Sequence, residues 1–345
     1  MQRGKKKKKM ANWKEVPEDL LIEILLRLSV KSLIRFRCVS KTWRDLIKST
    51  KFSAMHFECD KDEIVLIYRY VQKENQHVIS LHSNDDSLSQ VSTDVRIPYF
   101  DARTYLQILG PCNGLICITN YETIVLCNPV LQEFYLLPDR PFPCPHGFRP
   151  MELGLGFGFD PCTNDYKVFR MSEIVNEDDD EYWSIDCLKY EIYNLSTNSW
   201  REIDAAAPRV STFPCFELFF NGAYFPESCL ELDGKHSSLV VLDECLAMVR
   251  YQAWMKEPHL IDIWVMKEYG VKESWIKQFT VGPILVMCPL SSWKNYTLLM
   301  ESSNGQLVSY ALDTNIVKKY EIYSDRRHSL LVIIFKESLV STIST

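Results

Sequence analysis

Apolar residues recur at helical spacing close to the start of the chain. Pro17 suits a first helical turn, where a missing N–H costs nothing, and Glu18 and Asp19 place negative charge where the helix dipole favours it. One apolar stripe follows at spacings of three and four residues, formed by Leu20, Leu21, Ile24, Leu25 and Leu28. The pattern predicts that a helix begins here.

Two more short helices are predicted directly afterwards. Ser29 can cap a second helix that carries Leu33, Phe36 and Arg37, and Ser40 can cap a third that carries Trp43, Leu46 and Ile47. Residues 13–52 are too few to close a core of their own, and exposed apolar area on so small a unit usually marks an interface. The alternative is that the stripe packs on the chain's own C-terminal part.

Past Phe57 the apolar pattern changes from helical to β. Short β-branched or aromatic runs, bounded by Asn, Gly, Pro, Ser or Asp, lie at 63–71, 114–119, 123–127, 189–193 and 238–242. Many short strands with such boundaries are typical of an all-β fold.

A weak internal repeat runs through this β region. A strand, a turn with Asn or Asp, and a second strand recur at 125–138, 190–203, 261–279 and 307–322. The aromatic residue after the turn is Phe134, Trp200, Trp275 or Tyr320. One hairpin type that recurs at such intervals predicts a propeller, whose kelch-type blades run ~40–50 residues. A β-sandwich with repeated hairpins is the alternative.

Length and composition are consistent with a globular protein of roughly two domains. The chain has 345 residues, 46% of them apolar and 12% aromatic, which is enough for a sizeable core. No run of about 18 apolar residues predicts a transmembrane helix, and no apolar signal core follows the basic start. Twelve cysteines without a C-x-x-C pair favour reduced, mostly buried thiols. We therefore expect an intracellular protein, in the cytoplasm and also in the nucleus.

Charge is unevenly spread along the chain. Arg3 and Lys5–Lys9 contribute six positive charges, so the net charge of −6 becomes −12 for the remainder. The lysine run is interpreted as a solvated tail, with a nuclear-localisation or phosphate-binding patch as the alternative. A like-charge block, interpreted as a loop tip, comprises Glu177, Asp178, Asp179, Asp180 and Glu181. Our hypothesis is that this block and segment 224–236 select a basic client.

No catalytic motif emerges from the sequence. There is no G-x-S-x-G, H-E-x-x-H or phosphate-loop pattern, and the glycines at 154, 156 and 158 follow strand period. Cys144 and His146 match no zinc spacing, and the seven histidines are scattered. We expect no catalytic residue, no metal and no cofactor. A propeller enzyme with a fortuitous helical leader is the competing hypothesis.

The helical segment resembles the F-box family. P-E-D-L at 17–20, L-L-R-L-S-V-K-S-L at 25–33 and R-C-V-S-K-T-W at 37–43 match its motif in residue type and spacing, with Val16 where leucine is more frequent. The resemblance implies docking on a Skp-type adaptor and, through it, on cullin and RING subunits of a ubiquitin ligase. The positions that match the adaptor-facing motif are Val16, Pro17, Leu20, Leu21, Ile24, Leu25, Leu28, Val30, Leu33, Cys38, Val39 and Trp43.

The β region resembles the kelch-related, F-box-associated domain of plant F-box proteins. The matching phrases include L-G-P-C-N-G-L-I-C at 109–117, G-F-G-F-D-P-C-T-N-D-Y-K-V at 156–168 and Y-N-L-S-T-N-S-W-R at 193–201. The nearest resemblance is to S-locus F-box proteins, through phrases such as I-L-G-P-C-N-G-L-I and S-L-V-V-L-D-E-C-L. It implies a pollen receptor that directs non-self stylar ribonucleases, S-RNases, to ubiquitination. An S-locus-like receptor for another client, or a scaffolding protein outside any ligase, is the alternative.

These observations predict a multidomain chain. A basic tail occupies 1–10, a small all-α F-box of three helices 11–57, and an all-β, kelch-like propeller 58–345. After Asn221 and Gly222 the chain is shorter than the family pattern, which implies one incomplete blade or a closed ring with another strand count. We expect a non-catalytic receptor with a protein client, and no nucleic acid or membrane as partner.

Overall fold

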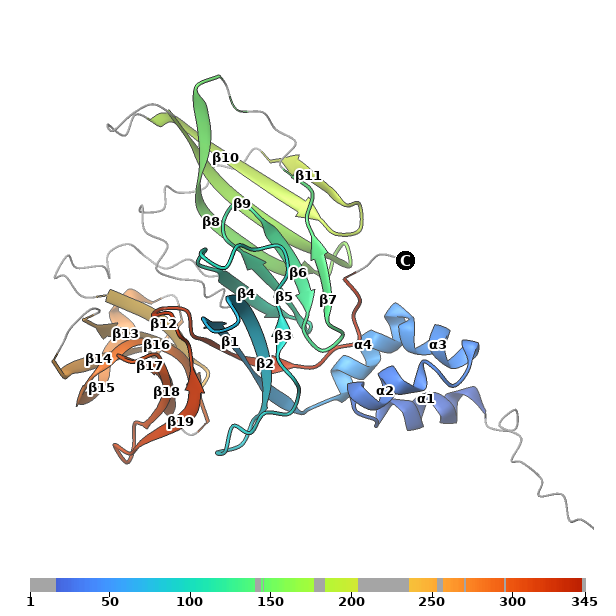
Figure 1. Ribbon diagram of the computed structural model, residues 1–345, viewed down its shortest axis with the longest axis horizontal. Coiled ribbons are helices and arrows are strands. Elements are labelled where there is room, and N and C mark those ends of the chain that lie inside the picture. Colours follow the sequence, from blue (N-terminus) through green and yellow to red (C-terminus); the bar gives the residue numbers. More distant parts are fainter. Residues whose placement is uncertain are drawn as a thin grey trace, which may run out of the picture.

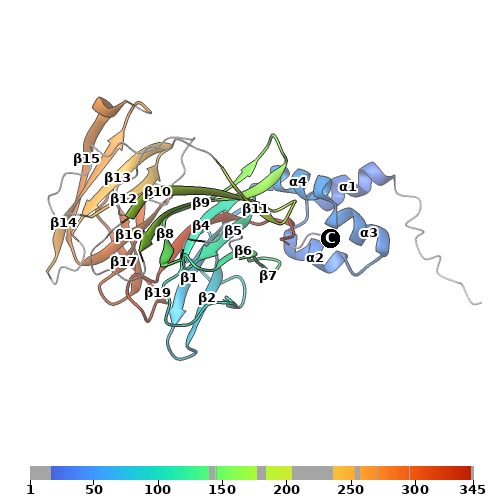
Figure 2. The ribbon, with the colours of Figure 1, turned by 90° about the horizontal axis from the view of Figure 1, so that it is seen from above.

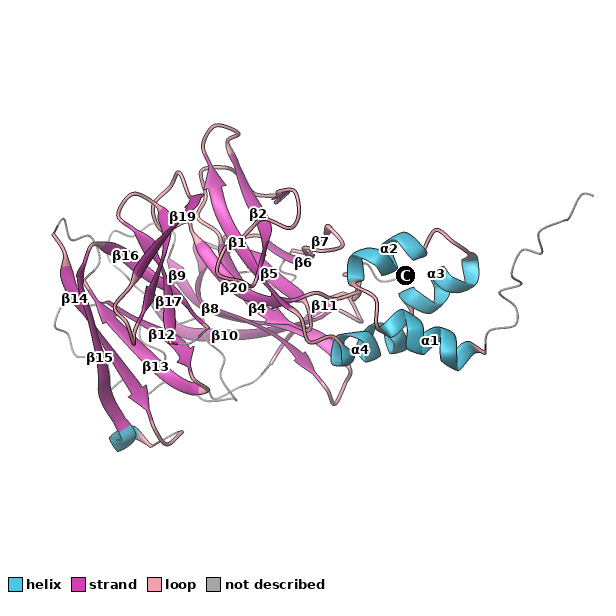
Figure 3. Ribbon diagram, turned by 90° about the horizontal axis from the view of Figure 1, so that it is seen from below, coloured by secondary structure: helices cyan, strands magenta, loops and turns pink. Residues whose placement is uncertain are grey.

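The α-helices lie together at one end of the strands, and one short helix lies among the strands (Figure 3). The computed structural model describes residues 17–139, 144, 146–176, 184–203, 236–252, 257–269, 271–294 and 296–342. The basic tail, the acidic block at 177–181 and the segment after Asn221 lie outside the described residues. No described helix has both the length and the apolar character needed to cross a membrane.

The helical unit has one helix more than predicted. Its helices are α1 (Glu18–Leu26), α2 (Val30–Phe36), α3 (Lys41–Lys48) and α4 (Thr50–Cys59). Ser40 caps α3 as predicted, since its Oγ accepts from the Trp43 N–H at 3.1 Å. Ser29 is the N-cap residue of α2 as predicted, but its side chain makes no capping hydrogen bond and lies 3.1 Å from Ser32 Oγ instead. Ser49 caps the unpredicted α4 through the Phe52 N–H.

The described residues of the β region form five antiparallel sheets of four strands (Figure 1). Sheet 1 is β20 (Leu331–Lys336), β1 (Glu63–Val71), β2 (Gln76–Ser83) and β3 (Val95–Arg96). Sheet 2 is β4 (Gln107–Cys112), β5 (Leu115–Thr119), β6 (Ile124–Asn128) and β7 (Glu133–Leu136). Sheet 3 is β8 (Phe148–Asp160), β9 (Asp165–Asn176), β10 (Ser184–Asn194) and β11 (Ser199–Glu202).

The last two sheets follow the same plan. Sheet 4 is β12 (His236–Leu242), β13 (Cys245–Tyr251), β14 (His259–Met266) and β15 (Trp275–Ile284), with the short helix η3 (Lys272–Ser274) before β15. Sheet 5 is β16 (Val286–Trp293), β17 (Thr297–Ser302), β18 (Gln306–Ala311) and β19 (Val317–Tyr323). All five predicted strands lie within or overlap β1, β5, β6, β10 and β12, so the pattern analysis is confirmed there.

The sheets pack face to face in the order 3, 2, 1, 5, 4. One apolar cluster joins each neighbouring pair, and the first strands of the sheets adjoin in the order β8, β4, β20, β16 and β12. Sheets 1, 2 and 5 each pack against two neighbours, as propeller blades do, whereas a sandwich has two facing layers. The predicted propeller-type architecture is confirmed, and the sandwich alternative is wrong.

The repeated hairpins are the last two strands of sheets 2 to 5, namely β6–β7, β10–β11, β14–β15 and β18–β19. A recurring turn contributes to this regularity. The hydroxyls of Tyr193 and Tyr310 each donate to the Oδ1 of an asparagine five residues later, Asn198 or Asn315, at 2.8 Å. Both asparagines have positive φ, 48° and 58°. Asparagine tolerates this left-handed backbone better than most residues, so the turn needs it.

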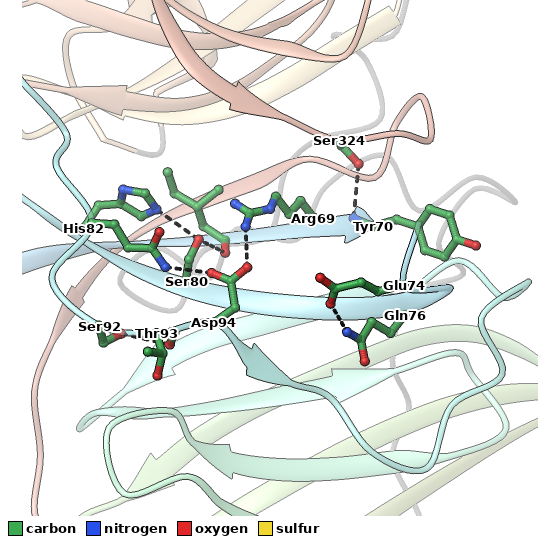
Figure 4. Close-up of polar contacts among 12 residues, drawn as sticks. Arg69, Tyr70, Glu74, Gln76, Ser80, His82, Ser92, Thr93, Asp94 and Ser324 are labelled. Atoms are coloured by element: carbon green, nitrogen blue, oxygen red, sulfur yellow. Dashed lines mark hydrogen bonds and ion pairs between the residues drawn. The ribbon is translucent and has the colours of Figure 1, made fainter. Parts of the chain in front are cut away.

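Sheet 1 departs from this plan because its outer strand, β3, has only two residues. Side chains hold the segment before it to the sheet instead (Figure 4). Arg69 on β1 forms an ion pair with Asp94, which also accepts from Gln90 Nε2 at 2.7 Å. On β2, His82 Nε2 lies 2.9 Å from Ser80 Oγ. Sheet 1 is completed at its inner edge by β20, the last strand of the chain, which pairs with β1.

Beyond β20, residues 337–342 form what we call the strap. It runs from sheet 1 along sheet 2 to the helical unit. The side-chain amide of Asn128 donates to the Ser338 and Val340 carbonyls at 2.9 and 2.8 Å. Gly114 gives the strap room, since a Cβ at this position would lie 2.1 Å from Ser338 Cβ. The strap is therefore fitted closely to the turns at one end of sheet 2.

The strap also completes the helical core. Leu339 is 2% exposed and packs with Leu25, Val30, Leu33, Ile47 and Phe52. Val130, in the turn between β6 and β7, packs against the same cluster. The helices thus share their core with two residues far away in the sequence, which holds the helical unit against sheet 2.

Truncation of Leu339 tests this arrangement. Leu339→Ala should destabilise the helical unit by about 2–5 kcal/mol, because it removes buried methyl groups and leaves a cavity. Hydrogen exchange of the α1–α4 amides should accelerate accordingly. The matched control is Ile316→Ala, at a residue that is 63% exposed, where the change should stay within about 0.5 kcal/mol. Unchanged helix protection in Leu339→Ala would contradict a structural role of the strap.

One carboxyl group lies fully inside sheet 5. Glu301 on β17 is 0% exposed, and its Oε1 accepts from the His328 N–H at 3.0 Å. Burial raises the pKa of Glu301 to about 7, although backbone hydrogen bonds from His328 and Leu330 act in the opposite direction. The folded protein therefore holds this proton more tightly than the unfolded chain, in which the pKa is near 4.5.

This raised pKa predicts a pH-dependent stability. A carboxyl whose pKa is higher in the folded state stabilises the fold below about pH 4.5, and that contribution is lost as the pH rises through about 7. Between pH 5 and pH 8 the loss should approach roughly 3 kcal/mol as an upper bound. Glu301→Gln should flatten this decline in urea unfolding, whereas the exposed control Asp313→Asn should retain it. The same pH slope in Glu301→Gln and wild type would refute the assignment.

Candidate functional site

Among the described residues of the helical unit, three large apolar side chains are exposed. Leu20 and Ile24, one turn apart on α1, are 52% and 54% exposed, and Val39, after α2, is 61% exposed. The helical unit projects from the end of the sheets, so solvent reaches these residues (Figure 2). Large apolar side chains at such exposure on a small helical unit are typical of an interface. We call these three residues the adaptor face.

The other predicted adaptor-facing residues differ in burial. Pro17 and Cys38 are exposed, Leu21, Leu28 and Trp43 are half-buried, and Leu25, Val30 and Leu33 are fully buried. Val16 lies outside the described residues. Trp43 packs edge-on against Phe36, with ring centroids 5.5 Å apart. The buried members support the adaptor face from beneath, and their contact with an adaptor stays a prediction.

The alternative that the apolar stripe packs on the chain's own C-terminal part is confirmed for one side of the stripe, whereas its use as an interface stays a prediction. One side of it packs on the chain's own C-terminal part, through Leu339 and Val130. The other side, with Leu20 and Ile24, remains open. The spacing of the stripe could not separate these sides, because the covering residues come from distant parts of the sequence.

The strand ends far from the helical unit form a second surface, which we call the distal face. β1 starts near α4, so its last residue, Val71, lies at the end of the sheet far from the helices. β20 runs the opposite way and ends at the strap, so the start of β20 also lies at this far end (Figure 1). By this strand direction the distal face comprises the turns 72–75, 120–123 and 303–305 and the links 97–106 and 324–330. The helical unit leaves this face free.

Tyrosines are prominent on the distal face. Tyr99, Tyr105, Tyr121 and Tyr323 are all exposed, Tyr105 most of all at 62%. The Arg326 guanidinium lies 4.0 Å from the Tyr70 ring centroid and 5.2 Å from that of Tyr105. Arg326 also donates to the Thr104 carbonyl at 2.7 Å, which fixes the link between sheets 1 and 2. Exposed tyrosines on an ordered frame suit protein recognition.

The distal tyrosines were not predicted from the sequence. The predicted client candidates, Glu177, Asp178, Asp179, Asp180 and Glu181, lie outside the described residues, as does all but the last residue of segment 224–236. Within the described ranges, no cluster of three or more His, Cys, Asp or Glu side chains could hold a metal ion. The spacing of the four tyrosines in the sequence does not indicate that they share a surface, because they come together only through the direction of the strands.

Comparison with known proteins assigns both parts of the chain. Residues 13–54 match the F-box domain family, and residues 64–225 match the F-box associated beta propeller domain family. Among solved structures, an oligogalacturonate lyase in complex with manganese aligns with a TM-score of 0.38 and 9% identity, over 77% of this chain and 82% of that chain. Likeness at that level carries no argument about activity.

Two Arabidopsis thaliana proteins align along most of the chain. F-box protein CPR1 is 27% identical over 87% of this chain and 82% of its own length. F-box/kelch-repeat protein At3g23880 is 27% identical over 84% of this chain and 86% of its own length. The chain is thus a plant F-box protein, with an F-box domain and an F-box-associated beta-propeller domain, homologous to F-box proteins of Arabidopsis thaliana.

Proposed function

We propose that this protein is the substrate-recognition subunit of a Skp/cullin/F-box ubiquitin ligase. An F-box joined to a propeller domain implies such a receptor, and F-box proteins are generally non-catalytic. The observation that carries the proposal is the pair of free surfaces. Leu20, Ile24 and Val39 are exposed on the F-box, and tyrosines such as Tyr99 and Tyr105 are exposed on the distal face of the propeller. One surface would bind the adaptor and the other the client.

The mechanism is positioning. The adaptor would bring cullin and RING subunits with their charged ubiquitin carrier, while the propeller holds the client nearby. Binding both partners raises the effective concentration of client lysines at the ubiquitin carrier. Because Leu339 and Val130 fix the F-box to sheet 2, client and carrier keep a defined relative orientation.

For the client we propose a basic stylar S-RNase, recognised in pollen during self-incompatibility. Two sequence features support this: the S-locus-type phrases and the charge of −12 for the chain beyond its basic tail. A body of that charge accelerates encounter with a basic protein. An S-locus-like receptor for another client is the second candidate, because such proteins share the phrases. The ligase role would place the protein in the cytoplasm, with the nucleus as a second compartment.

Adaptor binding tests the ligase role directly. Leu20→Asp combined with Ile24→Asp should abolish a stoichiometric complex with a plant Skp-type adaptor in size-exclusion chromatography. Loss of two apolar contacts should weaken binding at least about 100-fold. Both residues are more than half exposed, so the fold should survive, whereas Leu25→Asp would place a charge in the helical core.

The matched control is Ile316→Asp with Val317→Asp, two exposed apolar residues at the start of β19. It adds the same charge and should leave the adaptor complex intact. Failure of folded wild-type protein to bind the adaptor would point to the scaffolding alternative outside a ligase.

Reconstitution tests the S-RNase proposal. With adaptor, cullin, RING and ubiquitin-charging enzymes, the wild type should transfer ubiquitin to non-self S-RNases and leave a pollen donor's own S-RNase unmodified. The Leu20→Asp, Ile24→Asp variant should lose this transfer, because it separates the client from the ligase. A ligase that assembles but modifies none of a panel of allelic S-RNases would favour the S-locus-like alternative.

A further inference from the structure

A cavity of about 190 Å³ opens between sheets 2 and 3, at the distal end of sheet 2. Its lining comes from several parts of the chain, with Tyr99, Glu122, Leu136, Asp139, Arg170 and Trp200 as the members that matter here. Glu122 belongs to the turn between β5 and β6, and Asp139 follows β7. The cavity therefore lies on the side of the molecule that we assign to the client.

The floor of the cavity is held rigidly. Trp200 Nε1 on β11 donates to the Pro138 carbonyl at 3.0 Å, which connects sheet 3 to sheet 2. The Arg170 guanidinium on β9 lies 4.4 Å from the Trp200 ring centroid. Because both residues are less than 10% exposed, the floor exists before any ligand arrives. A preformed floor lowers the entropic cost of binding.

The positive charge of Arg170 is already neutralised. Its Nε lies 2.8 Å from Glu191 Oε2 and 3.9 Å from Glu152 Oε1, so two carboxylates face one guanidinium. Because this charge is already paired inside the fold, Arg170 opposes the binding of a basic ligand at the cavity only weakly.

The rim of the cavity is acidic and aromatic. Glu122 and Asp139 are exposed carboxylates, and Tyr99 beside them is 57% exposed. Since Glu152 and Glu191 already pair with Arg170, the charges of Glu122 and Asp139 at the rim are not offset by Arg170, which disfavours an anionic ligand. A tyrosine face and two carboxylates together suit a lysine ammonium or an arginine guanidinium.

We infer that this cavity binds a client peptide segment through one basic side chain. The lysine or arginine would lie between Glu122 and Asp139 against Tyr99. The inference rests on the proposed receptor function and specifies its client chemistry. It assigns part of the chain's negative charge to one specific binding site.

A peptide-binding experiment tests this site. The probe is a fluorescein-labelled hexapeptide with a central Lys-Arg pair, read by fluorescence anisotropy on the full chain in complex with its adaptor. Glu122→Gln with Asp139→Asn should weaken binding about fivefold to tenfold, the effect of two partly exposed ion pairs. Tyr99→Leu, which keeps the apolar bulk, should weaken it about threefold. The counterpart peptide with Glu-Asp at the centre should not bind.

The matched control is Glu268→Gln with Asp86→Asn, which removes two exposed carboxylates away from the cavity and from the distal face. It should change affinity less than twofold. Equal weakening in both double variants, equal binding of the acidic peptide, or no binding of the basic peptide to wild type would each overturn the site. The adaptor complex is measured on the same samples. An intact complex then leaves the receptor function standing when the cavity proposal fails, whereas a missing complex refutes the receptor function itself.

Discussion

The relative placement of the two domains depends on the side-chain amide of Asn128. Its Nδ2 donates to the carbonyls of Ser338 and Val340, while its Oδ1 accepts from the Val130 and Leu131 N–H groups. One side chain thereby satisfies backbone groups of both the β6–β7 turn and the strap. Aspartate at this position would lose both donors and leave the two strap carbonyls without these partners.

Both elements that Asn128 joins reach into the F-box. The turn carries Val130 and the strap carries Leu339, and each packs on the helical core. A unit as short as the F-box buries little apolar surface alone, so these two residues add appreciably to its stability. The F-box is therefore docked on the propeller rather than tethered by a linker. For a protein that acts by positioning, a docked domain narrows the range of distances between client and ubiquitin carrier.

Local patterns predicted the local parts of this structure. Ser40 caps the third helix, and the strand runs match β1, β5, β6, β10 and β12, because capping and alternation are properties of neighbouring residues. The repeated hairpins were visible because similar turns recur in sheets 2 to 5. The fourth helix was missed since its buried positions include Ser53 and His56, and His56 Nε2 bonds the distant Leu28 carbonyl. Such polar positions do not form an apolar stripe.

The candidate sites, too, could be predicted only in part from local sequence, because distant contacts complete them. The spacing of Leu20, Ile24 and Leu25 places them on one helix, but only contacts with Leu339 and Val130 decide which side is covered. The cavity between sheets 2 and 3 depends on Trp200 reaching Pro138, a contact across 62 residues. Contacts at that separation follow from the packing of whole sheets, which no local window of sequence contains.

The pairing of β20 with β1 also determines the order in which parts of the chain can fold during translation. Residues 331–342 supply the inner strand of sheet 1 and then the strap, so neither the first sheet nor the F-box core is complete until this segment has been synthesised. During translation the F-box emerges first, yet it acquires its full packing last. A nascent chain would thus fix its F-box against the propeller only after β20 has paired with β1 and the strap has packed on the helices. Chains interrupted before residue 331 would carry the adaptor-binding helices without the packing that orients them.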